Sequence, residues 1–170
     1  WLQLVLSLRF ELKQYAQIPR VLKILLERHP KKKTYWLQLA QVYEELNDSK
    51  RALAVMELAY NAGVLETPQE RINLVQRLVA QRASAKGAKI LEAEMAAGRV
   101  PRDTNSLKLL ANAWLHARER KKALDSLALL AKSDSTGKTY LRMAQVNMEM
   151  ERWEDATRSI RSAFSKGGLD

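Results

Sequence analysis

Residues 35–63 read YWLQLAQVYEELNDSKRALAVMELAYNAG, two amphipathic segments separated by the turn-forming run Asn47-Asp48-Ser49. Apolar and small side chains recur in both segments at intervals of three and four residues, first at Trp36, Leu39, Ala40 and Tyr43, then at Ala52, Met56 and Ala59. Such intervals place side chains on one face of an α-helix. We therefore predict two helices joined by a short turn, with their apolar faces packed together.

The same pattern returns along the chain at nearly constant spacing. The small residue of the first segment recurs at Ala40, Val75, Ala111 and Ala144, in steps of 35, 36 and 33 residues, and that of the second segment recurs in the same steps at Ala52, Gly87, Ala123 and Ala156. A small side chain where two helices cross lets their axes approach to roughly 8–10 Å. Unrelated amphipathic helices would show drifting intervals, so the spacing favours a true repeat.

This repeat resembles the tetratricopeptide repeat (TPR), a pair of antiparallel helices that stacks with its neighbours. The resemblance implies an all-α fold, a right-handed superhelical solenoid of about five hairpins, at residues 1–32, 33–67, 68–102, 103–136 and 137–170. TPR solenoids bind protein partners in a concave groove and seldom catalyse reactions. We therefore expect a protein-binding scaffold that is not an enzyme.

Local signals mark where several helices start and stop. Thr67-Pro68-Gln69-Glu70 is a capping box with proline at the first helical position, and Gly63, Gly98 and Gly167 stand where a left-handed residue commonly closes a helix. The first helix of residues 1–32 fits the repeat about one residue out of phase. Gly87 and Glu94 replace alanines of the pattern, so we expect loose packing in the third hairpin.

The two ends of the chain differ in polarity. Thr157, Ser159 and Ser162 occupy outward phases of the last helix, which predicts a polar terminal cap. The first helix instead carries apolar residues on nearly every side, at Trp1, Leu2, Leu4, Val5, Leu6 and Leu8. That surface needs a partner, so we expect self-association or contact with a preceding segment. Because the chain also lacks an initiator methionine, we expect it to be the C-terminal part of a longer protein.

Composition excludes several kinds of site. The chain has no cysteine and only two histidines, His29 and His116, without a second ligand at metal-binding spacing, so we predict no metal, no cofactor and no disulfide. It carries 29 basic and 19 acidic residues, and each half has a net charge of +5. This even distribution favours acidic partners but gives no basic arm for nucleic acid. The chain contains no run of about 18 apolar residues, so the sequence predicts no membrane-spanning helix.

TPR geometry implies that the first helix of each hairpin lines the groove. Gln41, Gln76, Asn112 and Gln145 would then share one inward phase, and their amides could pair with an extended peptide backbone. The remaining candidate groove residues are Gln38, Asn73, Lys108, Lys138 and Arg142. Lys138 and Arg142 match one pair of the carboxylate clamp found in chaperone-binding TPR domains. Ile72 and Leu109 replace other clamp residues, so we reject a chaperone adaptor of that type.

Four short strings, Tyr35-Trp36-Leu37-Gln38-Leu39, Leu58-Ala59-Tyr60-Asn61-Ala62-Gly63, Ala97-Gly98-Arg99-Val100 and Lys166-Gly167-Gly168-Leu169, support a closer resemblance. They are similar to the periplasmic TPR protein encoded with ExbB, ExbD and TonB in some gram-negative bacteria. The resemblance implies a periplasmic, inner-membrane-associated accessory of TonB-dependent iron-siderophore uptake, with TonB, ExbB or ExbD as partners. The alternative is a TPR module that regulates, or recruits substrates to, an upstream enzyme or membrane-assembly protein.

Overall fold

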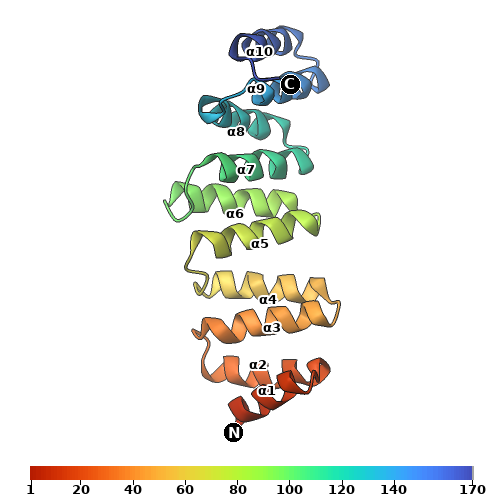
Figure 1. The fold of residues 1–170 in the computed structure, drawn as a ribbon, viewed down its shortest axis with the longest axis vertical. Helices are drawn as coiled ribbons and strands as arrows, with labels where there is room; N and C mark the ends of the chain where they lie inside the picture. The colour runs from red at the N-terminus through yellow and green to blue at the C-terminus, as the bar shows by residue number, and fades with distance from the viewer. Residues whose placement is uncertain (170) are drawn as a thin grey trace. The chain divides into compact units, whose positions relative to one another are not determined.

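The computed structural model describes residues 1–169, and these form helices joined by short turns, with no strand among them (Figure 1). The helices are α1 (Leu2–Glu11), α2 (Ile18–Arg28), α3 (Lys33–Glu45), α4 (Ser49–Asn61), α5 (Pro68–Ala80), α6 (Ser84–Ala96), α7 (Thr104–His116), α8 (Arg120–Ser133), α9 (Lys138–Glu149) and α10 (Trp153–Lys166), with a 3₁₀ turn, η1 (Tyr15–Gln17), before α2. The chain divides into two compact units, Trp1–Arg77 and Leu78–Asp170, and the boundary falls within α5. The prediction of an all-α fold is confirmed.

Within each unit, consecutive helices pack as hairpins. In the first unit α1 packs on α2 and α3 on α4, and in the second unit α7 packs on α8 and α9 on α10. The second helix of a hairpin also contacts the first helix of the next, as α2–α3, α6–α7 and α8–α9. Small residues lie buried in these contacts, among them Ala40, Ala52, Ala111, Ala123 and Ala156. Each helix is thus stabilised mainly by the apolar face that it shares with its neighbours.

One residue in the turn of each hairpin adopts a left-handed conformation. These residues are Lys13, Asn47, Arg82, Arg118 and Glu151, spaced by 34, 35, 36 and 33 residues. The next residue then donates its backbone N–H to a carbonyl of the preceding helix, as Gln14→Arg9, Asp48→Tyr43, Ala83→Leu78, Glu119→Trp114 and Arg152→Asn147. This is the Schellman closure of a helix C-terminus. All five hairpins therefore turn in the same way.

The first hairpin is in register with the others, so the predicted shift of one residue is wrong. Its left-handed residue, Lys13, lies 34 residues before Asn47. When positions are counted from the turn, Leu6 and Ile18 correspond to the small residues Ala40 and Ala52 of the second hairpin. Both Leu6 and Ile18 are buried. Bulky side chains at these positions disguised the repeat, although the backbone geometry is kept.

The predicted helix boundaries are confirmed where their hydrogen bonds can be followed. Thr67 Oγ1 accepts from the Glu70 N–H at 3.2 Å, and Glu70 Oε2 accepts from the Thr67 N–H at 2.9 Å, which completes the capping box. Gly63, Gly98 and Gly167 have φ angles of 72°, 70° and 73°. Glycine adopts this left-handed conformation without the penalty that a Cβ would bring.

Glu94 fills its position in the third hairpin rather than loosening it. Its side chain is 1% exposed and accepts two hydrogen bonds from the Arg99 guanidinium, at 2.6 and 2.8 Å. Its main-chain carbonyl accepts from the N–H groups of Arg99 and Val100, at 2.9 and 3.2 Å. A buried carboxylate is tolerated only when it is paired in this way. The pair therefore closes the turn that follows α6.

The two terminal helices both expose large apolar side chains. Trp1, Leu4 and Leu8 of the first helix are 97%, 69% and 55% exposed, while Leu6 points inward. On α10, Trp153 and Phe164 are 61% and 71% exposed. Ser159 is buried, and its hydroxyl donates to the Asp155 carbonyl at 2.8 Å. The predicted polar face of the last helix is therefore confirmed only in part: Thr157 is exposed, but Ser159 faces inward and two aromatic rings lie outward.

Removing the Arg99 side chain should destabilise the protein more than removing the Glu94 side chain. Arg99→Met leaves a buried carboxylate without its guanidinium, which should cost about 2–4 kcal/mol. Glu94→Ala removes the charge and introduces the residue found at the matching position 59, so about 1 kcal/mol is expected. Urea unfolding followed by circular dichroism measures both. The double variant should be no less stable than Glu94→Ala, and an Arg99→Met protein as stable as the parent would contradict the assigned role of the pair.

Candidate functional site

The first unit holds four of the predicted groove residues, Gln38 and Gln41 on α3 and Asn73 and Gln76 on α5. Gln41, Asn73 and Gln76 are exposed, and Asn73 Oδ1 accepts from Gln69 Nε2 at 2.8 Å. Gln38 is half-buried, and its carbonyl oxygen is buried without a hydrogen-bond partner among the described residues. That oxygen is therefore not presented to a ligand on the surface.

Ion pairs join α3 to α5 at both ends in the first unit. Lys33 Nζ lies 3.0 Å from Glu70 Oε1 and 3.2 Å from Glu66 Oε2, and Arg77 pairs with Glu44. The hydrogen bond to Glu70, followed by that to Glu66, raises the pKa of Lys33. These charges are neutralised within the chain, so this side of the first unit presents little uncompensated charge to a partner.

Four predicted site residues lie around one cleft in the second unit. The cleft has a volume of about 290 Å³ and is lined by Lys108 and Asn112 from α7 and by Lys138 and Arg142 from α9. The rest of its lining comes from Ala111, Leu127, Leu130, Asp134, Thr136 and Thr139. The two first helices of successive hairpins thus supply the polar groups, while the second helix between them supplies the apolar floor.

The balance of charge in this cleft is positive. Neither Lys108 nor Arg142 has a carboxylate partner among the described residues. Arg142 instead donates from Nη1 to Gln145 Oε1 at 2.7 Å, which places the fourth predicted amide beside the cation. Lys138 is also exposed at the cleft. Asp134 is the acidic member of the lining, and the chain itself supplies the donors to its carboxylate.

Asp134 organises the loop that leads into α9. Its Oδ1 accepts from the Thr136 N–H at 3.0 Å and from the Thr136 hydroxyl at 3.1 Å, and its Oδ2 accepts from the Thr139 hydroxyl. The hydrogen bond from Thr139, joined by those from Thr136, lowers the pKa of Asp134 to about 2. The carboxylate also lies near the positive end of the α9 dipole. The start of α9, and with it Lys138, is therefore held in place by this loop.

Glycine is required at the end of the same loop. The Gly137 N–H donates to the Gly167 carbonyl at 2.7 Å, and a Cβ at position 137 would lie 2.2 Å from the Ala163 oxygen. This loop was not predicted from the sequence. Its signal was the run Asp134-Ser135-Thr136-Gly137 before a helix, since Asp, Ser and Thr favour local hydrogen bonds to the backbone.

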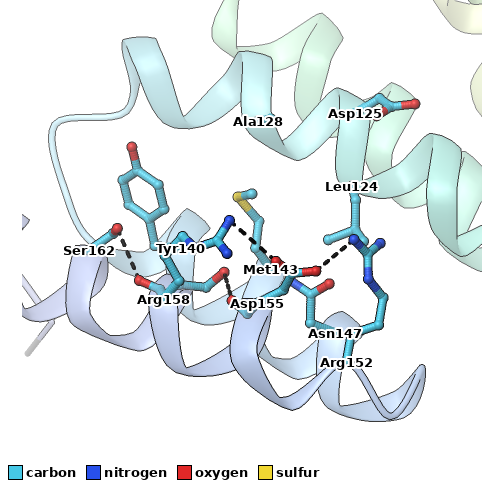
Figure 2. A pocket seen from close by; sticks show the side chains of 11 residues that line it. Leu124, Asp125, Ala128, Tyr140, Met143, Asn147, Arg152, Asp155, Arg158 and Ser162 are labelled. Atoms are coloured by element: carbon cyan, nitrogen blue, oxygen red, sulfur yellow. Dashed lines mark hydrogen bonds and ion pairs between the residues drawn. The ribbon is translucent and has the colours of Figure 1, made fainter.

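A second cleft lies on a different side of α9, between α8 and α10, and is shown in Figure 2. It has a volume of about 310 Å³, with Leu124, Ala128 and Met143 among its apolar lining. Asp155 pairs there with Arg152 at 2.6 Å and with Arg158 at 3.3 Å, as the dashed lines in Figure 2 show. Because these charges neutralise one another, the second cleft presents less uncompensated charge to a ligand than the first.

The second cleft follows from a change in the repeat. Asn147 occupies the position held in earlier hairpins by Tyr43, Leu78 and Trp114, all of which are buried. It is also buried, but it is shorter, and its Oδ1 has no hydrogen-bond partner among the described residues. A shorter side chain leaves space that the larger residues fill elsewhere. The cleft was not predicted from the sequence, although Asn147 at this position of the repeat was its signal.

Residues 1–169 contain neither a metal-binding cluster nor a membrane-spanning helix. No three histidine or carboxylate side chains there come together in a way that could hold a metal ion. None of the helices in this range combines the length and the apolar character needed to cross a bilayer.

Neutralising Asp134 should weaken the protein mainly above pH 4. The folded state lowers the pKa of this carboxyl from 3.8 to about 2. Its stabilising contribution is therefore complete above pH 4 and is lost as the pH falls toward 2. After allowance for solvent screening we expect Asp134→Asn to cost about 1–2 kcal/mol at neutral pH.

Thermal unfolding of the parent and Asp134→Asn at several pH values measures this contribution. The two stability curves should converge as the pH falls from about 4 to about 2. Asp125→Asn, which removes an exposed carboxylate from α8, is the matched control. A constant difference between parent and Asp134→Asn across this range would show that Asp134 does not act through its charge.

Comparison with known proteins identifies the fold. No protein-family model matches the sequence, and no curated protein is similar to it. Among solved structures, YrrB, a TPR protein with an unusual peptide-binding site, has a TM-score of 0.63 and 17% identity over 95% of this chain and 82% of YrrB. MamA AMB-1 has a TM-score of 0.62 and 16% identity over 98% of this chain and 97% of MamA.

A further match is MamA from Desulfovibrio magneticus RS-1, residues 41 to the end, with a TM-score of 0.59 and 15% identity over 97% of this chain and 92% of that one. At these identities the likeness shows the fold alone. The predicted helical solenoid of TPR-like hairpins is confirmed.

Proposed function

We propose that this chain is a non-catalytic scaffold that binds an extended, acidic segment of a partner protein in the cleft between α7 and α9. The observation that carries the proposal is the placement of Lys108, Asn112, Lys138 and Arg142 around one cleft, where the single carboxylate among the described lining residues, that of Asp134, is engaged by its own loop. A partner carboxylate would find cations there, together with an amide that can pair with its backbone.

The shape of the cleft favours a peptide over a compact small molecule. It is open to solvent, and its polar groups come from two helices on either side of the apolar residues Leu127 and Leu130. A chain laid across it could place an apolar side chain on this floor while its backbone meets Asn112. YrrB, which has a similar fold, is described as having a peptide-binding site, and this supports a peptide as the ligand.

Charge determines which peptide is preferred. Lys108 and Arg142 lie in a protein of net charge +10, so an acidic segment gains from both the local and the overall field. The contacts are exposed, and each exposed ion pair contributes about 0.2–1 kcal/mol. The structure therefore supports binding that is moderate in strength and sensitive to salt.

Replacing the cleft cations should weaken binding of an acidic peptide. We expect Lys108→Gln combined with Arg142→Gln to raise the dissociation constant of a labelled Glu- and Ser-rich peptide about three- to tenfold at low ionic strength. The loss should shrink at high salt. Fluorescence anisotropy at two ionic strengths measures it, with the matched peptide carrying Gln in place of Glu as the uncharged probe.

Lys121→Gln, an exposed cation on α8 that does not line this cleft, is the control for net charge. It should bind the acidic peptide nearly as well as the parent. Equal weakening by Lys121→Gln and by the cleft variants would refute a specific site, as would equal affinity of the parent for the charged and uncharged peptides.

The amide at the cleft should contribute to binding without contributing to folding. Asn112 is exposed, so Asn112→Ala should leave the melting temperature nearly unchanged. One lost hydrogen bond should weaken peptide binding by about 0.5–1.5 kcal/mol. Gln81→Ala, an exposed amide in the turn after α5, is the control. Unaltered peptide binding by Asn112→Ala would show that the Asn112 amide makes no hydrogen bond to the peptide backbone.

The string resemblance described above supports a narrower proposal, a periplasmic accessory of TonB-dependent iron-siderophore uptake with TonB, ExbB or ExbD as the partner. Co-purification of the protein with solubilised inner membranes, probed for these three proteins, tests it. Recovery of none of them, in cells where they are expressed, would reject it. An enzyme domain encoded upstream in the same chain would favour the alternative, a substrate-recruiting module.

A further inference from the structure

The two terminal helices present exposed apolar stripes of similar length. On the first helix, Trp1, Leu4, Leu8 and Leu12 follow one another at helical spacing, and all four are exposed. On α10 the corresponding stripe consists of Trp153, Ile160 and Phe164, with the polar Thr157 among them; Trp153 and Phe164 are exposed and Ile160 is half-buried. Apolar surface arranged in this way is costly to leave in water and commonly marks a contact with another protein.

The stripe on α10 corresponds to a face that is covered elsewhere in the protein. Counting from the hairpin turns, Thr157, Ile160 and Phe164 match Leu124, Leu127 and Ala131 of α8. Leu127 and Ala131 are buried and Leu124 is half-buried, and α8 packs on α9, the first helix of the next hairpin. The face on α10 is thus the kind of face that receives a first helix.

The stripe on α1 corresponds to the other half of that contact. The first helices α3, α7 and α9 each pack against the second helix of the hairpin before them, α2, α6 and α8. Among the described residues, α1 packs mainly on α2 and η1, and its Gln3 Nε2 also donates to the Tyr35 hydroxyl of α3 at 2.8 Å, so no earlier helix covers its outward face. Its outward leucines therefore lie where the other first helices meet a preceding hairpin.

We infer that α10 of one copy packs against α1 of a second copy, so that the protein associates head to tail through its two apolar stripes. This contact continues the α8–α9 packing across the molecular boundary. Charge favours it over pairing of two α10 helices, which would bring the exposed Arg161 of both copies together, whereas Arg158 is already paired with Asp155. Glu11, exposed on α1, instead offers a carboxylate to Arg161.

The contact is heterologous, so each copy retains one free end until a ring closes or the chain of copies stops. A helix of ten residues on one of fourteen buries an area at the low end of protein interfaces. The association should therefore be weak and strongly dependent on concentration.

Two variants, one at each end, test the inference. Leu4→Glu with Leu8→Glu blocks the α1 stripe, and Trp153→Glu with Phe164→Glu blocks the α10 stripe. Each should raise the dissociation constant for self-association more than about 100-fold, because several buried apolar side chains are lost. Leu58→Glu, at a 55% exposed leucine of α4, is the matched control and should associate like the parent. Sedimentation equilibrium over a range of concentrations measures mass, and circular dichroism verifies that each variant is folded.

Mixing the two blocked variants gives the sharpest outcome. Each retains one intact stripe, so the mixture should form a one-to-one dimer and nothing larger. A parent that stays monomeric at all concentrations would overturn the inference. Continued association of the α10 variant alone would show pairing of two α1 helices instead, and no dimer in the mixture would likewise overturn the head-to-tail contact. None of the four substituted residues lines the α7–α9 cleft, so peptide binding is tested separately.

Discussion

The close crossing of two helices in each hairpin is the constraint on which the rest of the structure depends. It is favoured by a small side chain at the crossing, as in most of the hairpins, and it requires a sharp reversal after the first helix. Alanines such as Ala40 and Ala123 meet the first condition, and left-handed residues such as Asn47 and Arg118 meet the second. Because the reversal has the same geometry in all five hairpins, it sets which face of each helix turns inward and which remains available for partners.

The individual hairpins differ where their residues depart from the repeat pattern. Leu6 and Ile18 place bulk at the first crossing, while Glu94 turns an alanine position into a buried ion pair with Arg99. Asn147 shortens the side chain at the large position and leaves the cleft of Figure 2. Each change is compensated locally, by packing, by pairing or by open space. A repeat fold tolerates such changes because every hairpin contacts only its neighbours.

The basic residues of the two units differ in whether a carboxylate of the same chain pairs with them. Lys33 and Arg77 of the first unit are neutralised by acidic residues of the same chain, so they act in folding. Lys108 and Arg142 of the second unit have no carboxylate partner among the described residues, and the Asp134 carboxylate beside them is held by two threonines. The same residue types thus form ion pairs within the first unit, whereas in the second unit we propose that they bind a partner, because no carboxylate of the described residues lies opposite them.

The periodicity predicted the helical hairpins, and local residue signals predicted the capping box at Thr67 and the glycine closures, because these depend on neighbours a few residues apart. The resemblance to TPR proteins selected Lys108 and Arg142 as candidates. The inward position of Ser159 depends on which helices pack against each other, and no local pattern contains that information. The convergence of α7 and α9 side chains on one cleft likewise arises only in three dimensions, since residues about thirty apart become neighbours through the packing of whole helices.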